Sequence, residues 1–196
     1  THDTLLFFTN NGKVYQTKGY GVPEYGRTAK GIPVINLLGI DSSEKIQTII
    51  SISNYKVENS KYLFFTTNFG IVKRTKIEAF SKIRTNGLIA IGLKDQDELI
   101  SVIESNGNQN LIIGTRLGYS VSFSEQAVRS MGRGASGVRG IRLREGDSVI
   151  GVAITEINKE VMVITENGFG KRTSIFEYPI KGRGGKGIKT ANITDK

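Results

Sequence analysis

The sequence has no cysteine and no tryptophan, and it has a single histidine, His2, and three prolines in 196 residues. Without cysteine there is no disulfide framework and no thiol chemistry. One histidine leaves too few ligands for a zinc site and no base for a Ser/His/Asp triad. The acidic residues lie mostly in stretches such as "KDQDE" and "REGD", where solvated turns are expected. We therefore expect no catalytic residues, no metal site and no cofactor in this chain.

Long hydrophobic runs are also missing. No stretch approaches the roughly 20 apolar residues that a membrane-spanning helix needs, and the first ten residues, "THDTLLFFTN", lack the basic start of a secretory signal. We expect no membrane partner and a cytoplasmic location. Hydrophobic residues still make up 38% of the chain, which is enough for a packed core.

Glycine and positive charge are what the sequence has in excess. The 24 glycines favour many short strands joined by tight turns over long helices. The 27 lysines and arginines outnumber the 18 acidic residues, which gives a formal net charge of +9. An excess of this kind favours a polyanionic partner such as nucleic acid.

One motif recurs four times, at intervals of roughly 50 residues. Each copy has an apolar run, then a threonine and, three residues later, a turn glycine, before a second strand begins. The copies are "LLFFTNNGKVYQT", "LFFTTNFGIVKRT", "LIIGTRLGYSVSF" and "VMVITENGFGKRT", with turn glycines Gly12, Gly70, Gly118 and Gly168.

A second glycine follows each turn glycine after 19 residues, or after 17 in the second copy, at Gly31, Gly87, Gly137 and Gly187. An apolar strand is expected after each, at "IPVINLL", "LIAIGL", "VRGIRL" and "IKTANI". The first three copies continue to a closing strand such as "KIQTIISI". Four short strands per unit predict an all-β array of propeller-like blades that bury their faces by stacking. The units are expected at about 1–54, 55–105, 106–156 and 157–196, in one domain.

Two of the loops, "GRGASG" (132–137) and "GRGGKG" (182–187), match the dinucleotide-binding pattern G-x-G-x-x-G. That pattern needs a helix directly after the loop to hold the pyrophosphate, and here strands follow. The phosphate loop pattern fails as well, because Lys186 is followed by Gly187. Nucleotide binding is therefore disfavoured.

The repeat explains these loops better, because they occupy the same place in their units and each carries basic residues. Loops from successive blades that emerge on one rim would form a stripe of positive charge suited to a phosphate backbone. The candidate DNA-binding residues are Arg27, Lys30, Arg84, Arg133, Arg139, Arg183, Lys186 and Lys189. A second basic set lies on the strand after the first turn, where alternation suggests a solvent face: Lys73, Arg74, Lys171 and Arg172.

The stretches "GRTAKGIPVINLL", "MGRGASGVRGIRL", "TENGFGKRTSIFEYP" and "RGGKGIKT" resemble the C-terminal domains of the DNA gyrase A subunit, over essentially the whole chain. The resemblance implies a β-pinwheel, in which four-stranded blades swap strands with their neighbours and wrap duplex DNA around a basic rim. Such a domain supports ATP-dependent negative supercoiling by the full topoisomerase. The implied partners are double-stranded DNA, the N-terminal catalytic part of the same polypeptide and the ATPase subunit.

The family's diagnostic box, Gln-Arg-Arg-Gly-Gly-Lys-Gly, is expected upstream of this chain, and "RGGKG" at 183–187 matches only its last five positions. About four blades of a six-bladed domain are expected here. Two alternatives remain open: the equivalent domain of the topoisomerase IV A subunit, and a propeller-type platform for protein interactions. The family's catalytic tyrosine belongs to another part of that polypeptide, so no tyrosine here is assigned a catalytic role.

Overall fold

The computed structural model describes residues 2–55 and 61–193. Its recurring element is a β-hairpin, formed at each of the four turn motifs. The amide of the turn glycine donates to the carbonyl of the threonine three residues earlier, at 2.9–3.0 Å in all four. These glycines have φ between 74° and 82°, a left-handed conformation that other residues adopt at a cost. The hairpins pair β1 (Thr4–Thr9) with β2 (Lys13–Lys18), β4 (Tyr62–Thr67) with β5 (Ile71–Lys76), β8 (Asn110–Thr115) with β9 (Tyr119–Ser124), and β12 (Glu160–Ile164) with β13 (Gly170–Ser174).

Three of the hairpins are extended to four-stranded antiparallel sheets. The unit's own closing strand joins one edge: β3 (Ile46–Ile52), β7 (Leu99–Ser105) or β11 (Val149–Thr155). The other edge takes a two-residue strand from the next unit: β6 (Leu88–Ile89), β10 (Val138–Arg139) or β14 (Ile188–Lys189). The resulting orders are β3-β1-β2-β6, β7-β4-β5-β10 and β11-β8-β9-β14, while β12 and β13 form a two-stranded sheet in the described part of the chain.

The exchanged strands enter the three sheets in one register. In the second sheet, Val138 pairs with Val72 and Arg139 with Ile71, and the other two sheets repeat these offsets from their glycines. The exchanged segment lies very close to the backbone of the strand with which it pairs. A Cβ on Gly137 would lie 2.5 Å from the Val72 carbonyl oxygen, and one on Gly187 would lie 2.5 Å from that of Ser120. Glycine at these positions therefore permits the strand exchange.

The core lies between neighbouring sheets, so the central strands are buried on both faces. Phe65 of β4 packs edge-on against Phe8 of β1, with ring centroids 5.6 Å apart, in a cluster shared by the first two sheets. The adjacent Phe64 points the other way and packs near Phe123 of β9, in a cluster shared with the third sheet. The fully buried aromatic rings thus fix how consecutive blades stack.

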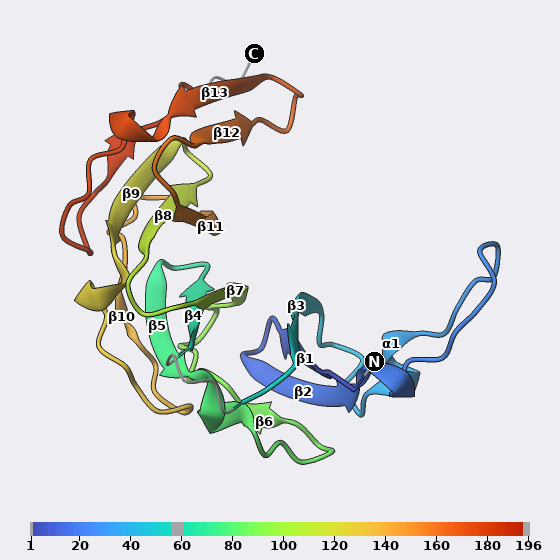
Figure 1. The fold of residues 1–196 in the computed structure, drawn as a ribbon. Coiled ribbons are helices and arrows are strands. Elements are labelled where there is room, and N and C mark those ends of the chain that lie inside the picture. Colours follow the sequence, from blue (N-terminus) through green and yellow to red (C-terminus); the bar gives the residue numbers. More distant parts are fainter. Residues whose placement is uncertain (1, 56–60, 194–196) are drawn as a thin grey trace.

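The stacked sheets form a curved arc, with the exchanged segments on its convex side (Figure 1). The all-β blade repeat predicted from the sequence is confirmed. Short 3-10 turns, η1 (Gly19–Gly21), η2 (Ile77–Phe80), η3 (Glu125–Ala127) and η4 (Ile175–Glu177), follow the hairpins. The longest α-helix in the described residues has four residues, and none of the helices there could cross a membrane.

The prediction of a strand at "IPVINLL" is wrong. Residues Val34–Leu37 form the short helix α1 instead, and the Leu38 amide donates to the Val34 carbonyl. In the second unit the corresponding amides, of Ala90 and Ile91, donate to the carbonyl of Gly12 in the preceding hairpin. Residues 34–37 have no preceding hairpin in this structure, so they close a helical turn on themselves.

A pair of alanine substitutions separates the cost of the glycine conformation from the cost of a blocked exchange. Gly31 and Gly137 have φ of 73° and 90°, so either Gly→Ala change carries about 1–2 kcal/mol of backbone strain. Only Gly137→Ala also places a methyl group against a neighbouring strand. We expect it to lower the free energy of unfolding by a further ~1–3 kcal/mol, measured by urea denaturation of dilute protein. Equal losses in the two variants would contradict the role assigned to Gly137.

Candidate nucleic-acid interface

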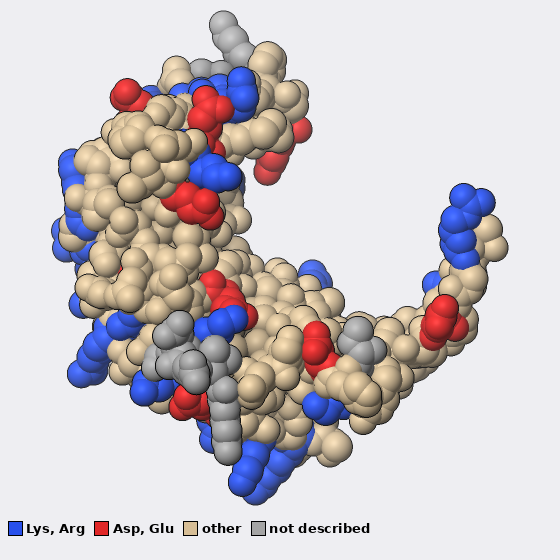
Figure 2. Space-filling view, viewed as in Figure 1, with Lys and Arg blue, Asp and Glu red and all other residues tan. Residues whose placement is uncertain are grey.

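The segments that carry the exchanged strands contain no acidic residues. Residues 25–40, 79–94, 126–144 and 178–194 hold two, three, five and four basic residues respectively. Acidic residues begin immediately outside, for example at Asp95 and Glu145. Figure 2 shows that lysine and arginine side chains gather along the convex edge, whereas acidic side chains gather more on the concave side. The convex edge is therefore a positive surface with little local compensation.

Neighbouring exchanged segments are joined by backbone hydrogen bonds. The Arg142 amide donates to the Gly185 carbonyl at 2.8 Å, and the Gly184 amide donates to the Gly140 carbonyl at 2.6 Å. The Gly92 amide donates to the Ala135 carbonyl at 3.2 Å. These bonds link the segments of the second, third and fourth units into one continuous strip of backbone, which we call the convex strip (residues 84–94, 132–144 and 181–189).

The convex strip brings together six of the eight residues predicted as the main DNA-binding set. Five of them are exposed and one, Arg133, is partly buried. Arg183 is also held in place, because its guanidinium donates to the carbonyls of Ala127 at 2.8 Å and Arg139 at 3.1 Å. The exposed members are Arg84, Arg139, Arg183, Lys186 and Lys189.

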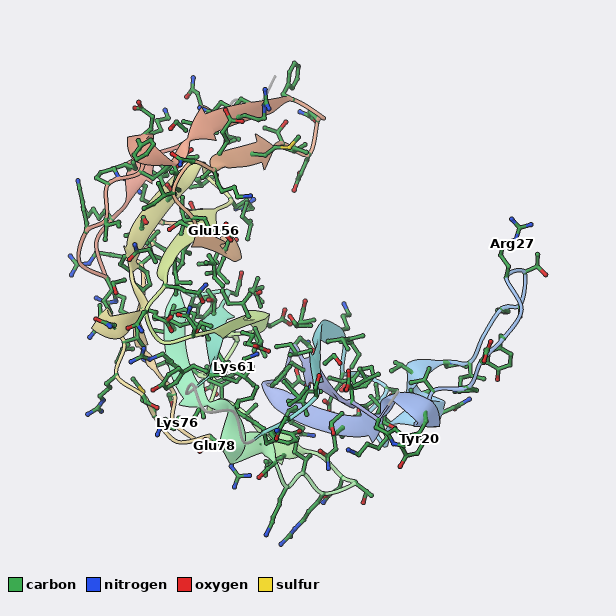
Figure 3. All side chains as sticks on the ribbon, viewed as in Figure 1. Tyr20, Arg27, Lys61, Lys76, Glu78 and Glu156 are labelled. Carbon is green, nitrogen blue, oxygen red and sulfur yellow. The ribbon has the colours of Figure 1, made fainter. Side chains whose placement is uncertain are left out.

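The remaining two, Arg27 and Lys30, do not lie with the others. They are exposed and belong to a long loop that projects from the far end of the arc, where Figure 3 labels Arg27 at the tip. The other loops lie on the hairpin of the preceding unit, and this loop has no such hairpin in the structure. The expectation of four aligned loops therefore holds for three of them.

Lys73 is not on a solvent face, which corrects the interpretation of the second basic set. Its side chain is fully buried and lies over the ring of Phe65, with Nζ 4.7 Å from the ring centroid. The ammonium group donates to the carbonyls of Ala90, Gly132 and Arg133. Lys73 thus anchors two neighbouring segments of the convex strip from inside. Burial lowers the pKa of its ammonium group to about 7.

Arg74 is also mostly buried, with 11% of its side chain exposed, so its prediction as a solvent-facing residue is wrong as well. It pairs with the buried carboxylate of Glu125 at 3.5 Å and stacks over Tyr62. The corresponding residues of the fourth unit, Lys171 and Arg172, are exposed. The same sequence pattern is buried where a neighbouring unit packs on it and exposed where none does.

Six further basic residues of the acid-free segments were not among the DNA-binding residues predicted from the sequence. Arg144 lies partly buried against the ring of Tyr119, with Cζ 3.2 Å from the centroid, and donates to the Lys186 carbonyl at 2.8 Å. It positions the last loop of the convex strip. The other five are exposed, and the length of the acid-free segments was the signal that would have found them: Lys82, Lys94, Arg129, Arg142 and Lys181.

A recess of about 170 Å³ lies under this last loop, lined by Ser120, Ser122, Lys181 and Lys186 among others. Val121, which also lines the recess, stands at the position in the third unit that Lys73 has in the second, and its side chain is shorter. The recess therefore lies beside two basic residues of the convex strip, with Pro179 and Ile188 also in its lining.

Two acidic turns have a structural role where solvated turns were expected. Asp97 accepts hydrogen bonds from the amides of Phe69 and Glu98 at 2.9 Å, and Asp147 does the same for Leu117 and Ser148. Each carboxylate therefore holds the hairpin turn of its own sheet.

The DNA gyrase C-terminal domain family, a β-propeller family, matches residues 3–53, 61–106, 109–156 and 159–196. The chain belongs to this family. The DNA gyrase A subunit of Staphylococcus epidermidis is 52% identical over the whole chain, which spans 22% of that protein. The chain thus covers about a fifth of the length of the curated gyrase protein that it matches.

Two solved structures extend the comparison. The C-terminal domain of DNA topoisomerase IV matches with a TM-score of 0.89 at 29% identity, over 96% of this chain and 58% of that one. The DNA gyrase A C-terminal domain matches with a TM-score of 0.80 at 28% identity, over 96% and 60%. The gyrase family fold and its topoisomerase IV counterpart therefore share this arrangement of blades.

The buried ammonium group gives the folded state a defined pH dependence. A lysine in the unfolded chain titrates near ~10.4, whereas Lys73 has a pKa of about 7 when folded. Between these values the unfolded chain binds more protons, so the contribution of Lys73 to the free energy of unfolding rises with pH. We expect the difference between wild type and Lys73→Met to grow by up to about 1.4 kcal/mol per pH unit from about pH 7 to 9. Urea titrations across this pH range measure it, and a constant difference would contradict the lowered pKa.

Proposed function

We propose that this domain binds duplex DNA along the convex strip and bends it around the arc. The observation that carries the proposal is the continuity of the strip: three loops, each acid-free and basic, are joined backbone to backbone on one edge. A row of positive charge with a fixed spacing suits the regular phosphates of a duplex better than it suits a protein partner with irregular charges.

The chemistry of the strip supports binding that tolerates any sequence. Its exposed charged groups are guanidinium and ammonium groups, which bind phosphate oxygens together with the glycine backbone. The described part of the strip has no helix or long side-chain array of the kind that enters a major groove to read base edges. The recess beside Lys181 and Lys186 offers one place for a phosphate group.

Bending follows from the shape of the strip. A duplex that contacts all three loops must follow the convex curvature seen in Figure 1. Bending a site of 20–30 base pairs through 40–90° costs roughly 1–6 kcal/mol, which several spaced phosphate contacts can offset. One loop alone would bind DNA without bending it.

In the full enzyme this wrapping would support ATP-dependent negative supercoiling in the bacterial cytoplasm, together with the catalytic part of the same polypeptide and the ATPase subunit. The proposal requires no cofactor within this chain. The TM-score of 0.89 supports the alternative role, in topoisomerase IV. The sequence identity supports the gyrase role more strongly, because it is 52% to a gyrase subunit over the whole chain and 29% to the topoisomerase IV domain.

Charge removal on the strip tests the proposal. Arg139→Gln, Lys186→Gln and Lys189→Gln change exposed side chains, so the fold should persist. If the domain neutralises about 6–10 phosphates, wild-type affinity should fall about 10³–10⁵-fold between 50 and 200 mM salt. The triple variant should bind more weakly at every salt concentration, and its salt slope should fall by about 1 for each phosphate that is no longer neutralised. Fluorescence anisotropy with a random-sequence duplex measures both quantities.

The matched control removes the same charge elsewhere, with Lys45→Gln, Arg116→Gln and Lys159→Gln, which are exposed but outside the acid-free segments. This control should retain most of the affinity. Equal losses of affinity in the two triple variants would show that binding depends on net charge alone, and would contradict binding at the convex strip. Binding that salt does not weaken would overturn the proposal itself.

A further inference from the structure

The middle segment of the convex strip (residues 132–144) has a buried cation directly beneath it. The Lys73 ammonium group donates to the carbonyls of Gly132 and Arg133 in this segment, and to the carbonyl of Ala90 in the neighbouring segment. An ammonium group has three hydrogens to donate, so the charged form of Lys73 can satisfy all three acceptors. A neutral amine has two hydrogens, and its lone pair would face one of the carbonyl oxygens. Protonation therefore strengthens the connection between two segments of the strip.

Lys73 has no anionic partner in the described part of the chain. None of the carboxylates there forms an ion pair with it, and burial alone accounts for the lowering of its pKa to about 7. Strand β4 contributes the uncharged ring of Phe65, and the neighbouring Arg74 pairs with Glu125. The two segments that Lys73 holds add only positive charge: Arg84, Lys94, Arg133, Arg139, Arg142 and Arg144. A negative group brought near would therefore stabilise the ammonium form.

The surface above Lys73 is open to an anion. Gly132 and Gly134 are exposed, and a Cβ on either would have no described atom within 4 Å. The hydrogen bonds of the ammonium group end on the backbone of this same segment, so its charge lies one layer of backbone below an open surface. Electrostatic attraction acts across such a layer, because a protein interior screens charges much less than water does.

The corresponding positions in the other two completed exchanges carry uncharged residues. Lys73 is the third residue after its turn glycine, and the same place is taken by Tyr15 in the first sheet and by Val121 in the third. Tyr15 supports its loop by contact, since a Cβ on Gly87 would lie 2.6 Å from the tyrosine ring. Val121 is buried and apolar. The middle exchange is therefore the one of these three in which the charge beneath the loop can change near neutral pH.

We infer that Lys73 is a positioning residue for duplex binding, and that DNA bound on the middle segment causes its amino group to take up a proton from solvent. The inference rests on the proposed function and deepens it. A phosphate above the segment supplies the missing negative charge and so favours the ammonium form. The ammonium form in turn holds the two segments together beneath the phosphate. Because coupling between two binding equilibria is reciprocal, a proton held more tightly when DNA is bound must also raise the affinity for DNA.

DNA affinity should therefore fall as the pH rises through the neutral range. The pKa of Lys73 is about 7 without DNA, and a nearby phosphate raises it. Below about pH 6 the amino group is charged with or without DNA, so the affinity stays level there. Above about pH 7 the free protein loses the proton and binding must restore it, so the affinity falls. One phosphate charge about 10–15 Å away, at an effective dielectric constant of about 20 and reduced by salt, gives a total fall of about threefold to tenfold.

The pH profile of DNA affinity tests the inference. Fluorescence anisotropy with a random-sequence duplex, at constant salt from about pH 6 to 9, should show this fall for the wild type. Lys73→Met removes the titrating group, so its profile should be flatter by about threefold to tenfold over the same range. His2 and the terminal amine also titrate in this range, but they are the same in both proteins. Superimposable profiles would overturn the inference even if the variant binds more weakly throughout, because a merely structural role lowers affinity alike at every pH.

A matched pair of surface variants locates the phosphate. Arg139 belongs to the segment above Lys73, and Lys189 holds the same place in the segment above Val121. Both are exposed, so either change to glutamine should leave the fold intact and weaken DNA binding. Arg139→Gln removes a phosphate contact near Lys73 and should also flatten the pH profile, whereas Lys189→Gln should keep the wild-type profile. Equal flattening in the two variants would contradict a coupling through the middle segment.

Calorimetry of the unmodified protein measures the proton itself. At about pH 7.5, the enthalpy of DNA binding should differ between Tris and HEPES buffers in proportion to their ionisation enthalpies, with the sign of proton uptake and up to about half a proton per bound protein. Lys73→Met should lose this uptake. No net uptake by the wild type, or the same uptake by the variant, would refute the coupling. A chain that binds no DNA at any pH would overturn the proposed function as well, whereas salt-sensitive binding without uptake would overturn this inference alone.

Discussion

The whole arrangement depends on a two-residue strand that leaves its own unit and pairs with the hairpin of the unit before it. The exchange is possible because glycine occupies both sides of the contact, with a left-handed backbone and no Cβ where the partner's carbonyl approaches. Hydrophobic stacking between sheets supplies much of the stability, yet the exchange decides which sheet lies next to which. It also carries the basic loops to the outside of the arc, where they meet one another.

The sequence predicted the repeat, the hairpin turns and the all-β fold, because each depends on residues close together in the chain. Threonine and glycine three residues apart specify the turn, and an apolar run before it specifies the strand. The closing strands were found for the same reason. Burial by neighbouring units was harder to foresee. Lys73 and Lys171 have the same local pattern, and only the packing of another unit buries Lys73.

The candidate site also combines features that depend on nearby residues with features that depend on packing between units. The basic loops and their common orientation could be predicted from their constant place in the repeat. The role of Arg144 could not, because its stacking on Tyr119 joins residues that are remote in sequence. The position of Arg27 was missed because a loop's location depends on the unit before it, and the first unit has no predecessor in this structure. Residues 34–37 became a helix for the same reason.

Each loop of the convex strip begins in one unit and is seated on another, and Lys73 fastens two of them to a strand of the second unit. A force applied to any loop by a stiff ligand is therefore shared between two sheets and does not separate one blade from its neighbour. The domain should resist such a load as a single elastic body. Its curvature, set by the stacking of rigid aromatic cores, then acts as a template whose length scales with the number of units.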